Sequence, residues 1–243
     1  KEALVSIFNQ EPDLIISDVM MPEMNGYELC TAIKSDINLC HIPIIFLTAK
    51  NDIDSKVKGL KVGAEAYIEK PFSYDYLKAQ ILSLLNNRQK EREAFSKRPF
   101  FPVQNMQMSK EDEVFMNKVI EVINANMEDE TFNVERMAEA LCLSRSSLLR
   151  KIKTLFNMSP IDFIRLIRLK KAAELIQDGK YRVGEISYMV GFGSHSYFSK
   201  RFFKQFGMTP KDFEQQIAST RSKVRNVQEI NIEDLIQNNR ANS

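Results

Sequence analysis

The last third of the chain contains one sequence pattern twice. Residues 156–163 read FNMSPIDF, and fifty residues later residues 206–213 read FGMTPKDF. Each copy follows two short stretches whose apolar residues recur at helical spacing, with a tight turn between them. The repeat predicts an all-α domain with two helix-turn-helix units, joined by one long helix over about 160–177. Two such units on one chain can clamp duplex DNA, so the repeat also indicates a function.

The two helix-turn-helix units follow the same plan. In the first, a helix is expected at 134–141, and Ser144 caps a second helix. In the second, apolar residues at 186–190 precede a turn, and Ser194 is the equivalent cap. Matching positions are 49 residues apart before the turns and 50 apart after them. The second turn therefore holds one extra residue, which we identify as Gly193 and expect to have a positive φ.

Charge is divided unevenly along the chain. Residues 1–87 hold 8 Lys and Arg against 12 Asp and Glu, a net charge of −4, whereas residues 133–217 hold 15 against 8, a net charge of +7. This division indicates an acidic regulatory half and a basic half with a polyanionic partner.

Composition excludes several classes of protein. No apolar run reaches the roughly 18–20 residues that a membrane helix needs, so no membrane contact is expected from this segment. The three cysteines have no C-x-x-C spacing, which favours reduced thiols over a disulfide or zinc framework. These features favour a cytoplasmic protein.

The basic half resembles the AraC/XylS family of transcription regulators over residues 111 to about 216. The matching motifs, in family order, are Ala138-x-x-Leu141, Gly191-Phe192, Ser196-Tyr197-Phe198 and Phe202-Lys204-Phe206-Gly207-x-Thr209-Pro210. In that family the second helix of each unit enters a major groove, and one monomer reads successive grooves on one DNA face. By position, the resemblance implies base contacts from Ser146, Leu149, Arg150, His195, Ser196, Ser199 and Lys200.

Individual positions differ in what they predict. Arg150 is the strongest candidate, because arginine can pair bidentately with guanine, whereas Leu149 would read a thymine methyl group. His195 is as well explained as a surface histidine at a helix start. Four further cations are predicted to contact phosphates, which position a protein without specifying sequence. They are Arg145, Lys153, Arg201 and Lys204.

The acidic half alternates apolar runs with helical patterns. The runs lie at 14–17, 43–48 and 66–68, and the helical patterns at 2–9, 27–35, 54–62 and 74–87. This alternation predicts a parallel α/β sheet. Asp18, Thr48 and Lys70 each stand at the carboxyl end of a predicted strand, so we expect them to converge on one point.

These three side chains suit phosphoryl transfer to a carboxylate. Asp18 would be the phosphoacceptor, forming an acyl phosphate. Thr48 would donate a hydrogen bond to a phosphoryl oxygen, and Lys70 would neutralise its charge. The small side chain of Ala49 would leave room for the incoming group.

With Asp18-x-x-Met21-Pro22, Gly26 and Lys70-Pro71-Phe72, residues 1 to about 87 resemble a receiver domain of two-component response regulators, a flavodoxin-like, doubly wound fold. The resemblance implies that Tyr67 is the aromatic switch, although a packed strand aromatic is the simpler interpretation. It also implies Mg²⁺, bound through an acidic pair after the first strand, Asp18 and the backbone carbonyl of Met20.

The receiver pattern starts in what resembles its second helix, so we expect an incomplete sheet. The metal site would then be incomplete, with Asp18 and the Met20 carbonyl alone, and no cofactor would be bound tightly. We expect inefficient phosphorylation of this chain. We also expect a piece of a longer hybrid regulator, whose upstream part could include a sensor kinase.

Four segments are predicted in chain order. They are a truncated receiver domain (1–87), a linker (88–110), an AraC-type DNA-binding domain (111–218) and a polar tail (219–243). The predicted function is sequence-specific DNA binding, as a non-enzymatic transcription regulator of a two-component phosphorelay that phosphorylation of Asp18 controls. The predicted partners are double-stranded DNA, a cognate histidine kinase domain, RNA polymerase and a second copy in a homodimer.

Two other functions fit parts of the sequence. One is a hydrolase with an aspartyl nucleophile, although Met20 stands where a haloacid dehalogenase pattern needs a second aspartate. The other is a protein-binding scaffold. Salt would distinguish DNA binding, because about 6–10 phosphate contacts lose about 10³–10⁵ in affinity between about 50 and 200 mM salt.

Overall fold

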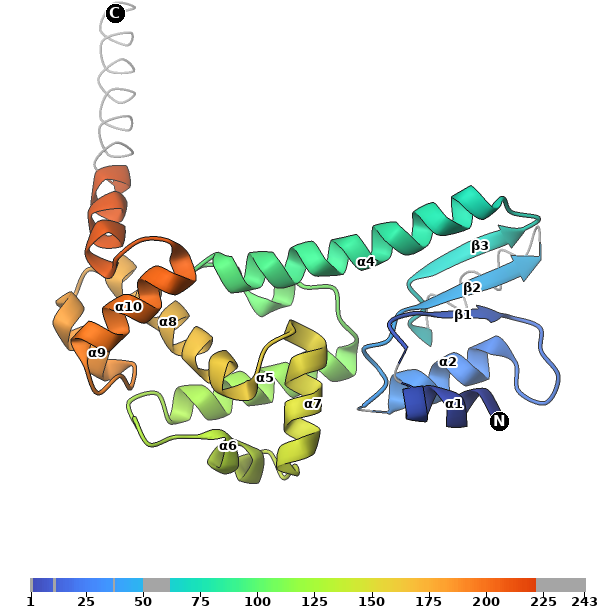
Figure 1. Cartoon of the computed structure of the whole chain (residues 1–243), viewed down its shortest axis with the longest axis horizontal. Coiled ribbons are helices and arrows are strands. Elements are labelled where there is room, and N and C mark those ends of the chain that lie inside the picture. The colour runs from blue at the N-terminus through green and yellow to red at the C-terminus, as the bar shows by residue number, and fades with distance from the viewer. Residues whose placement is uncertain (1, 11, 37, 50–61, 222–243) are drawn as a thin grey trace, which may run out of the picture. The chain divides into compact units, whose positions relative to one another are not determined.

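The computed structural model describes residues 2–10, 12–36, 38–49 and 62–221 (Figure 1). These residues form two compact units. The first contains residues up to 96, 101–125 and 132–164, and the second contains residues 97–100, 126–131 and those from 165 onward. The helix predicted at 54–62 and most of the predicted tail lie outside the described residues. No helix of the described ranges has the length and apolar character needed to cross a membrane.

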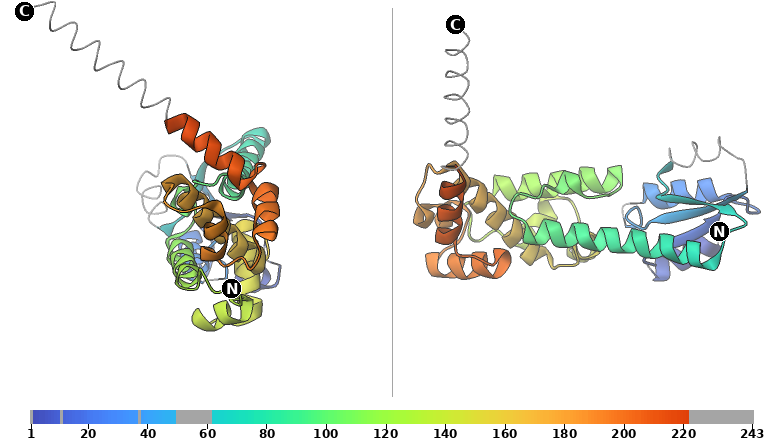
Figure 2. Two further views of the ribbon diagram at one scale, coloured as in Figure 1. Left: turned by 90° about the vertical axis from the view of Figure 1, so that its left-hand side faces the viewer. Right: turned by 90° about the horizontal axis from the view of Figure 1, so that it is seen from above.

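The first unit holds a parallel sheet. Its strands are β1 (Ile15–Asp18), β2 (Ile44–Ala49) and β3 (Ala66–Lys70), in the order β1-β2-β3. The strands lie side by side in Figure 1 and Figure 2, and the register sets Ala49 opposite Lys70. The apolar start of β2 is typical of a buried parallel strand, and its Ile45 and Phe46 are fully buried. The predicted α/β architecture is confirmed.

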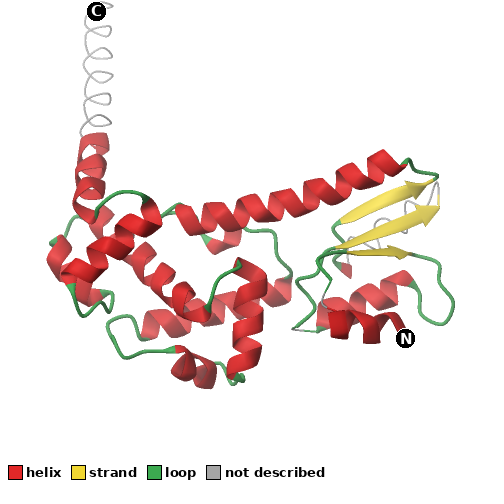
Figure 3. Ribbon diagram, in the orientation of Figure 1, coloured by secondary structure: helices red, strands yellow, loops and turns green. Residues whose placement is uncertain are grey.

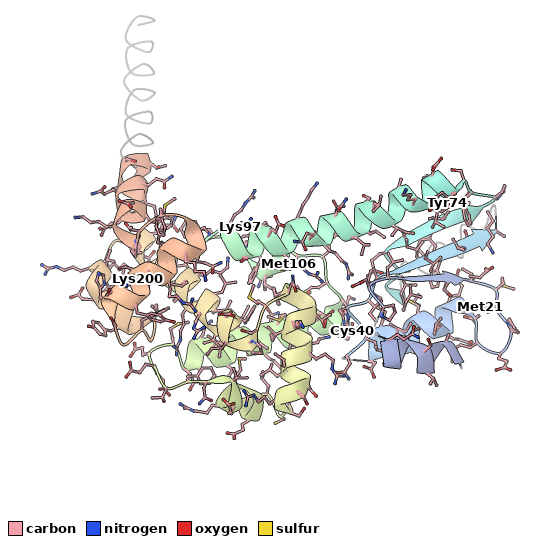
Figure 4. All side chains as sticks on the ribbon, viewed as in Figure 1. Met21, Cys40, Tyr74, Lys97, Met106 and Lys200 are labelled. Carbon is pink, nitrogen blue, oxygen red and sulfur yellow. The ribbon has the colours of Figure 1, made fainter. Side chains whose placement is uncertain are left out.

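Within the described ranges, helices accompany the sheet, as Figure 3 shows by secondary structure. They are α1 (Glu2–Gln10), α2 (Gly26–Ser35) and α4 (Tyr74–Lys97). A capping box of Asn25 and Glu28 starts α2. Helix α4, whose ends Tyr74 and Lys97 are labelled in Figure 4, runs ten residues beyond the pattern at 74–87, through the charged residues 88–94 that could continue this helix. It stops just before Pro99, which a helix interior does not tolerate.

The first helix-turn-helix pair belongs to the same unit. After the short 3₁₀ helix η1 (Val103–Asn105) come α5 (Lys110–Ala125), α6 (Val134–Ala140) and α7 (Arg145–Phe156). Asn133 caps α6, and its side chain accepts a hydrogen bond from Arg136 N. The pair matches the predicted bounds within two residues.

The second pair lies in the second unit. It consists of α9 (Val183–Met189) and α10 (His195–Phe206), followed by a helix over 210–221. The long helix α8 (Pro160–Asp178) contributes residues to both units. It ends before Gly179, whose φ is +71°, in agreement with the predicted stop.

The prediction for Gly193 is wrong in its reason. The glycine with positive φ in the second turn is Gly191 (+72°), the counterpart of Cys142 (+55°) in the first turn. Gly193 is the extra residue, but its φ is not positive, and a side chain there would only require the exposed side chain of Glu130 to move. A Cβ at this position would lie 2.2 Å from Oε2 of Glu130.

Candidate nucleic-acid interface and phosphate site

Packing decides which face of α7 is exposed. Leu148 and Ile152 are fully buried, and the Ser144 hydroxyl accepts a hydrogen bond from Ser147 N at 3.1 Å, which fixes where the helix begins. The opposite face therefore points to solvent. It carries every residue of α7 that the sequence assigned to DNA, namely Arg145, Ser146, Leu149, Arg150 and Lys153, all of them exposed.

Helix α10 likewise has one buried face and one exposed face. Phe198 and Phe202 are fully buried, and Ser194 accepts a hydrogen bond from Tyr197 N at 3.4 Å. The predicted residues lie on the other face of α10, where Figure 4 labels Lys200. His195, Ser196, Lys200 and Lys204 are exposed, and Ser199 and Arg201 are half-buried.

Arg145 and Ser146, two of the predicted contact residues, interact with neighbouring residues in the same domain. The guanidinium of Arg145 forms an ion pair with Glu135 at 2.8 Å, and both side chains are exposed. The hydroxyl of Ser146 lies 3.0 Å from the cap hydroxyl of Ser144. A DNA phosphate would have to compete with Glu135 for Arg145, which costs little because an exposed ion pair contributes at most about 1 kcal/mol.

Lys151 lies between the exposed cations Arg150 and Lys153 in the sequence, but it is not on the exposed face of α7. Its side chain is 4% exposed, and its ammonium group forms an ion pair with the fully buried carboxylate of Asp112 on α5. No periodicity in α7 reveals this pair, because the partner lies 39 residues earlier in the chain.

A second residue was missed on α10. Phe203 is 54% exposed, one helical turn beyond Ser199 and two beyond Ser196, on the predicted DNA-facing side. A phenylalanine at a helix interface with DNA can contact a thymine methyl group. The signal was available, because the repeat aligns Phe203 with the predicted phosphate contact Lys153.

The carboxyl ends of the three strands bring the predicted phosphate-site residues together. The Lys70 ammonium group donates a hydrogen bond to Asp18 Oδ2, and Met20 N donates to Oδ1 at 3.2 Å. The hydrogen bond from Lys70 holds the pKa of Asp18 below its usual value, so the carboxylate stays ionised at neutral pH.

Two buried hydroxyl groups at this site have no hydrogen-bond partner among the described residues. They are Thr48 Oγ1 and Tyr67 Oη. Burial raises the pKa of Tyr67, whose ring packs 5.5 Å from that of Phe46. A buried, unpartnered Thr48 hydroxyl is available to donate to an incoming oxyanion, and the ring of Tyr67 already points into the protein.

Gly26 packs closely against this site. A Cβ on this residue would lie 2.4 Å from the backbone oxygen of Asp18, so a glycine lets the start of α2 approach the end of β1. This contact explains the glycine that the receiver resemblance singled out.

The described residues do not fit a tightly bound Mg²⁺. No cluster of three or more Asp, Glu, His or Cys side chains that could hold a metal occurs in the described ranges. The carboxylate of Asp18 at this point is already paired with Lys70. Mg²⁺ prefers octahedral oxygen ligands and dehydrates reluctantly, so Asp18 and the Met20 carbonyl alone are too few.

Comparison with known proteins finds two families in this chain. Residues 1–82 match the family described as response regulator receiver domain, and residues 137–216 match the family described as helix-turn-helix domain. Over 203 residues the chain is 41% identical to histidine kinase P4 of Formosa agariphila. This match covers 84% of the chain, which spans only 15% of the kinase's length.

Solved structures match each part separately. The signal receiver domain of a signal transduction histidine kinase from Syntrophus aciditrophicus is 42% identical, with 35% of this chain and 64% of that chain covered and a TM-score of 0.33. The C-terminal domain of AraT, a response regulator from Geobacillus stearothermophilus, is 29% identical. It covers 42% of this chain and 84% of its own, with a TM-score of 0.38.

Proposed function

Because this chain joins a domain of the response regulator receiver family to an AraC-type helix-turn-helix domain, we propose that it is the DNA-binding output part of a two-component transcription regulator. One observation carries the proposal. Two serine-capped helices, α7 and α10, each carry the residues that the family resemblance assigns to DNA on one face, most of them exposed, while burying the opposite face.

In this proposal α7 and α10 read DNA from the major groove. Arg150 and Lys200 occupy equivalent places in the repeat, 50 residues apart, and both are exposed. Arg150 would pair bidentately with a guanine, and Lys200 would donate to guanine acceptors. The net charge of +7 over residues 133–217 would supply the salt-dependent attraction to phosphates.

Control would come from phosphorylation of Asp18 by the histidine kinase domain of a two-component system. A carboxylate oxygen of Asp18 would attack the phosphorus of a phosphohistidine. A phosphorus–oxygen bond would form, the phosphorus–nitrogen bond would break, and the imidazole would leave with the electron pair. Ionised Asp18, cationic Lys70 and the unpartnered hydroxyl of Thr48 support these roles.

The regulator would act in the cytoplasm as a homodimer on paired sites and would contact RNA polymerase. Mg²⁺ would support phosphorylation only with carboxylates beyond those described here. The proposal includes no catalytic turnover, because phosphorylation of a receiver domain serves as a switch.

Selection of binding sites from random duplex DNA tests the proposal. The unchanged chain should enrich a motif with two halves about one helical turn apart. Arg150→Ala should weaken selection at one half and Lys200→Ala at the other. Glu214→Ala, an exposed change outside both reading helices, is the control and should leave the motif intact. Binding without any enriched sequence would contradict specific recognition.

A further inference from the structure

One face of the C-terminal half of α4 contacts both the sheet and helix α7. Arg88, Arg92 and Phe95 follow one another at spacings of four and three residues, which places them on the same side of the helix. Arg88 donates a hydrogen bond to the backbone oxygen of His41 at 2.5 Å and pairs with Glu65 Oε1 at 3.1 Å. Since Glu65 immediately precedes β3, Arg88 fixes α4 to the sheet.

Arg92, one turn further along α4, closes the end of the reading helix α7. Its Nε donates to the backbone oxygen of Leu155 at 3.0 Å, and its Nη2 donates to that of Thr154 at 2.8 Å. The last four carbonyls of a helix have no partner within that helix. Asn157 N already donates to Lys153 O. The Arg92 guanidinium provides hydrogen-bond donors for the next two carbonyls, those of Thr154 and Leu155. A cation at the C-terminal end of a helix also interacts favourably with the helix dipole.

Phe95 adds an apolar contact beside this cap. Its ring centroid lies 4.9 Å from that of Phe156, the last residue of α7, and 6.1 Å from that of Phe163 on α8. Phe156 and Phe163 are themselves 4.8 Å apart, and the three side chains are at most 3% exposed. The stretch of α4 from Arg92 to Phe95 therefore holds the C-terminal end of α7 through both polar and apolar contacts.

We infer that Arg92 and Phe95 are positioning residues, through which the receiver helix α4 sets the orientation of reading helix α7. The inference rests on the proposed DNA-binding function and concerns its regulation. A movement of β3 or α4 in the receiver would reach α7 through Arg88, Arg92 and Phe95. Helix α10 belongs to the other compact unit, whereas these residues and α7 share the first. The receiver should therefore act on the half-site that α7 reads.

The test compares three duplexes built on the selected motif. One holds both half-sites, one has the α7 half-site scrambled, and one has the α10 half-site scrambled. Affinity is measured by fluorescence anisotropy for the full chain and for Arg92→Ala. On the two duplexes that keep the α7 half-site, the variant should bind about tenfold more weakly, because a charge-assisted pair of hydrogen bonds is lost. On the duplex without it, affinity should change less than about twofold.

Two further variants show whether the effect of Arg92→Ala on DNA affinity comes from the position of α7 or from the loss of a positive charge. Lys90→Ala removes a cation from an exposed position of α4 and should bind all three duplexes as the unchanged chain does. Arg92→Lys keeps the charge, but a lysine cannot donate to both carbonyls at once. Its loss of DNA affinity should therefore be intermediate and confined to the same two duplexes. The thermal midpoint of each variant is followed by circular dichroism.

The outcomes are distinguishable. If Arg92→Ala loses affinity equally for all three duplexes, or for none of them, the positioning role of Arg92 is overturned. Arg150→Ala tests the proposed function independently. If it binds the duplex with the intact α7 half-site as tightly as the unchanged chain does, the assignment of α7 as a reading helix fails, whatever Arg92 does.

Discussion

Breaking the buried ion pair between Lys151 and Asp112 should destabilise the protein strongly. The Lys151 side chain is 4% exposed and that of Asp112 is fully buried. Replacing Lys151 by Met, of similar length, leaves the carboxylate of Asp112 buried without its cation. An uncompensated buried charge costs about 3–5 kcal/mol, a large share of the roughly 5–15 kcal/mol that holds a domain folded.

A double variant separates the pair from its surroundings. In Lys151→Met with Asp112→Leu, neither charge remains, and replacing both partners of a buried pair by apolar groups is often neutral. Two hydrogen bonds are still lost, because the hydroxyl of Ser109 donates to Asp112 Oδ2 at 2.9 Å and the thiol of Cys40 donates to Oδ1 at 3.4 Å. The double variant should therefore lie within about 1 kcal/mol of the unchanged protein.

Urea unfolding at neutral pH, followed by circular dichroism, measures these differences. Lys153→Met is the matched control, because Lys153 is exposed on the same helix, and its effect should stay within about 0.5 kcal/mol. A loss below about 1 kcal/mol in Lys151→Met would refute the burial of the pair. A double variant as unstable as the single one would refute the electrostatic explanation.

Three other perturbations have defined outcomes. Gly191→Ala should lower the free energy of unfolding, measured by thermal unfolding, by at least about 2 kcal/mol, because φ is +72° and a Cβ would lie 2.5 Å from Met127 O. Gly184→Ala is the control and should not lower it, because there is open space around Gly184. Burial lowers the pKa of His41 to about 4, so the folded state resists protonation between the ordinary pKa of 6.5 and that value. Stability should fall by about 2 kcal/mol as the pH drops from about 7 to 5 in urea titrations, and a His41→Gln variant that falls equally would contradict this assignment. Acetyl phosphate with Mg²⁺ should not modify Asp18 stoichiometrically, and a full Mg²⁺-dependent mass shift would show that the ligand set suffices.

Sequence patterns located most of the elements because their signals are local. The caps Ser144 and Ser194 and the repeated apolar spacing gave the bounds of α7 and α10 within one residue. Likewise, parallel strands bring their carboxyl ends together whatever the loops do, so Asp18 and Lys70 could be placed in contact from the sequence.

What the sequence missed depends on partners distant in the chain. Lys151 has the composition of a surface residue, and only Asp112 explains its burial. Residues 88–97 are highly charged and show no apolar stripe, yet α4 continues through them because Arg92 and Phe95 find partners on α7 and α8. At Gly193 the repeat identified the inserted residue, but the carboxylate of Glu130 that lies against this position comes 63 residues earlier in the chain.

In the proposed function, α7 and α10 of one chain read two half-sites on one face of DNA. Equilibrium binding to the selected motif, and to a version with about five base pairs inserted between its halves, tests this clamp, because the insertion turns one half-site to the opposite face. Affinity for the lengthened duplex should fall to that for a single half-site. Unchanged affinity would rule out the two-helix clamp.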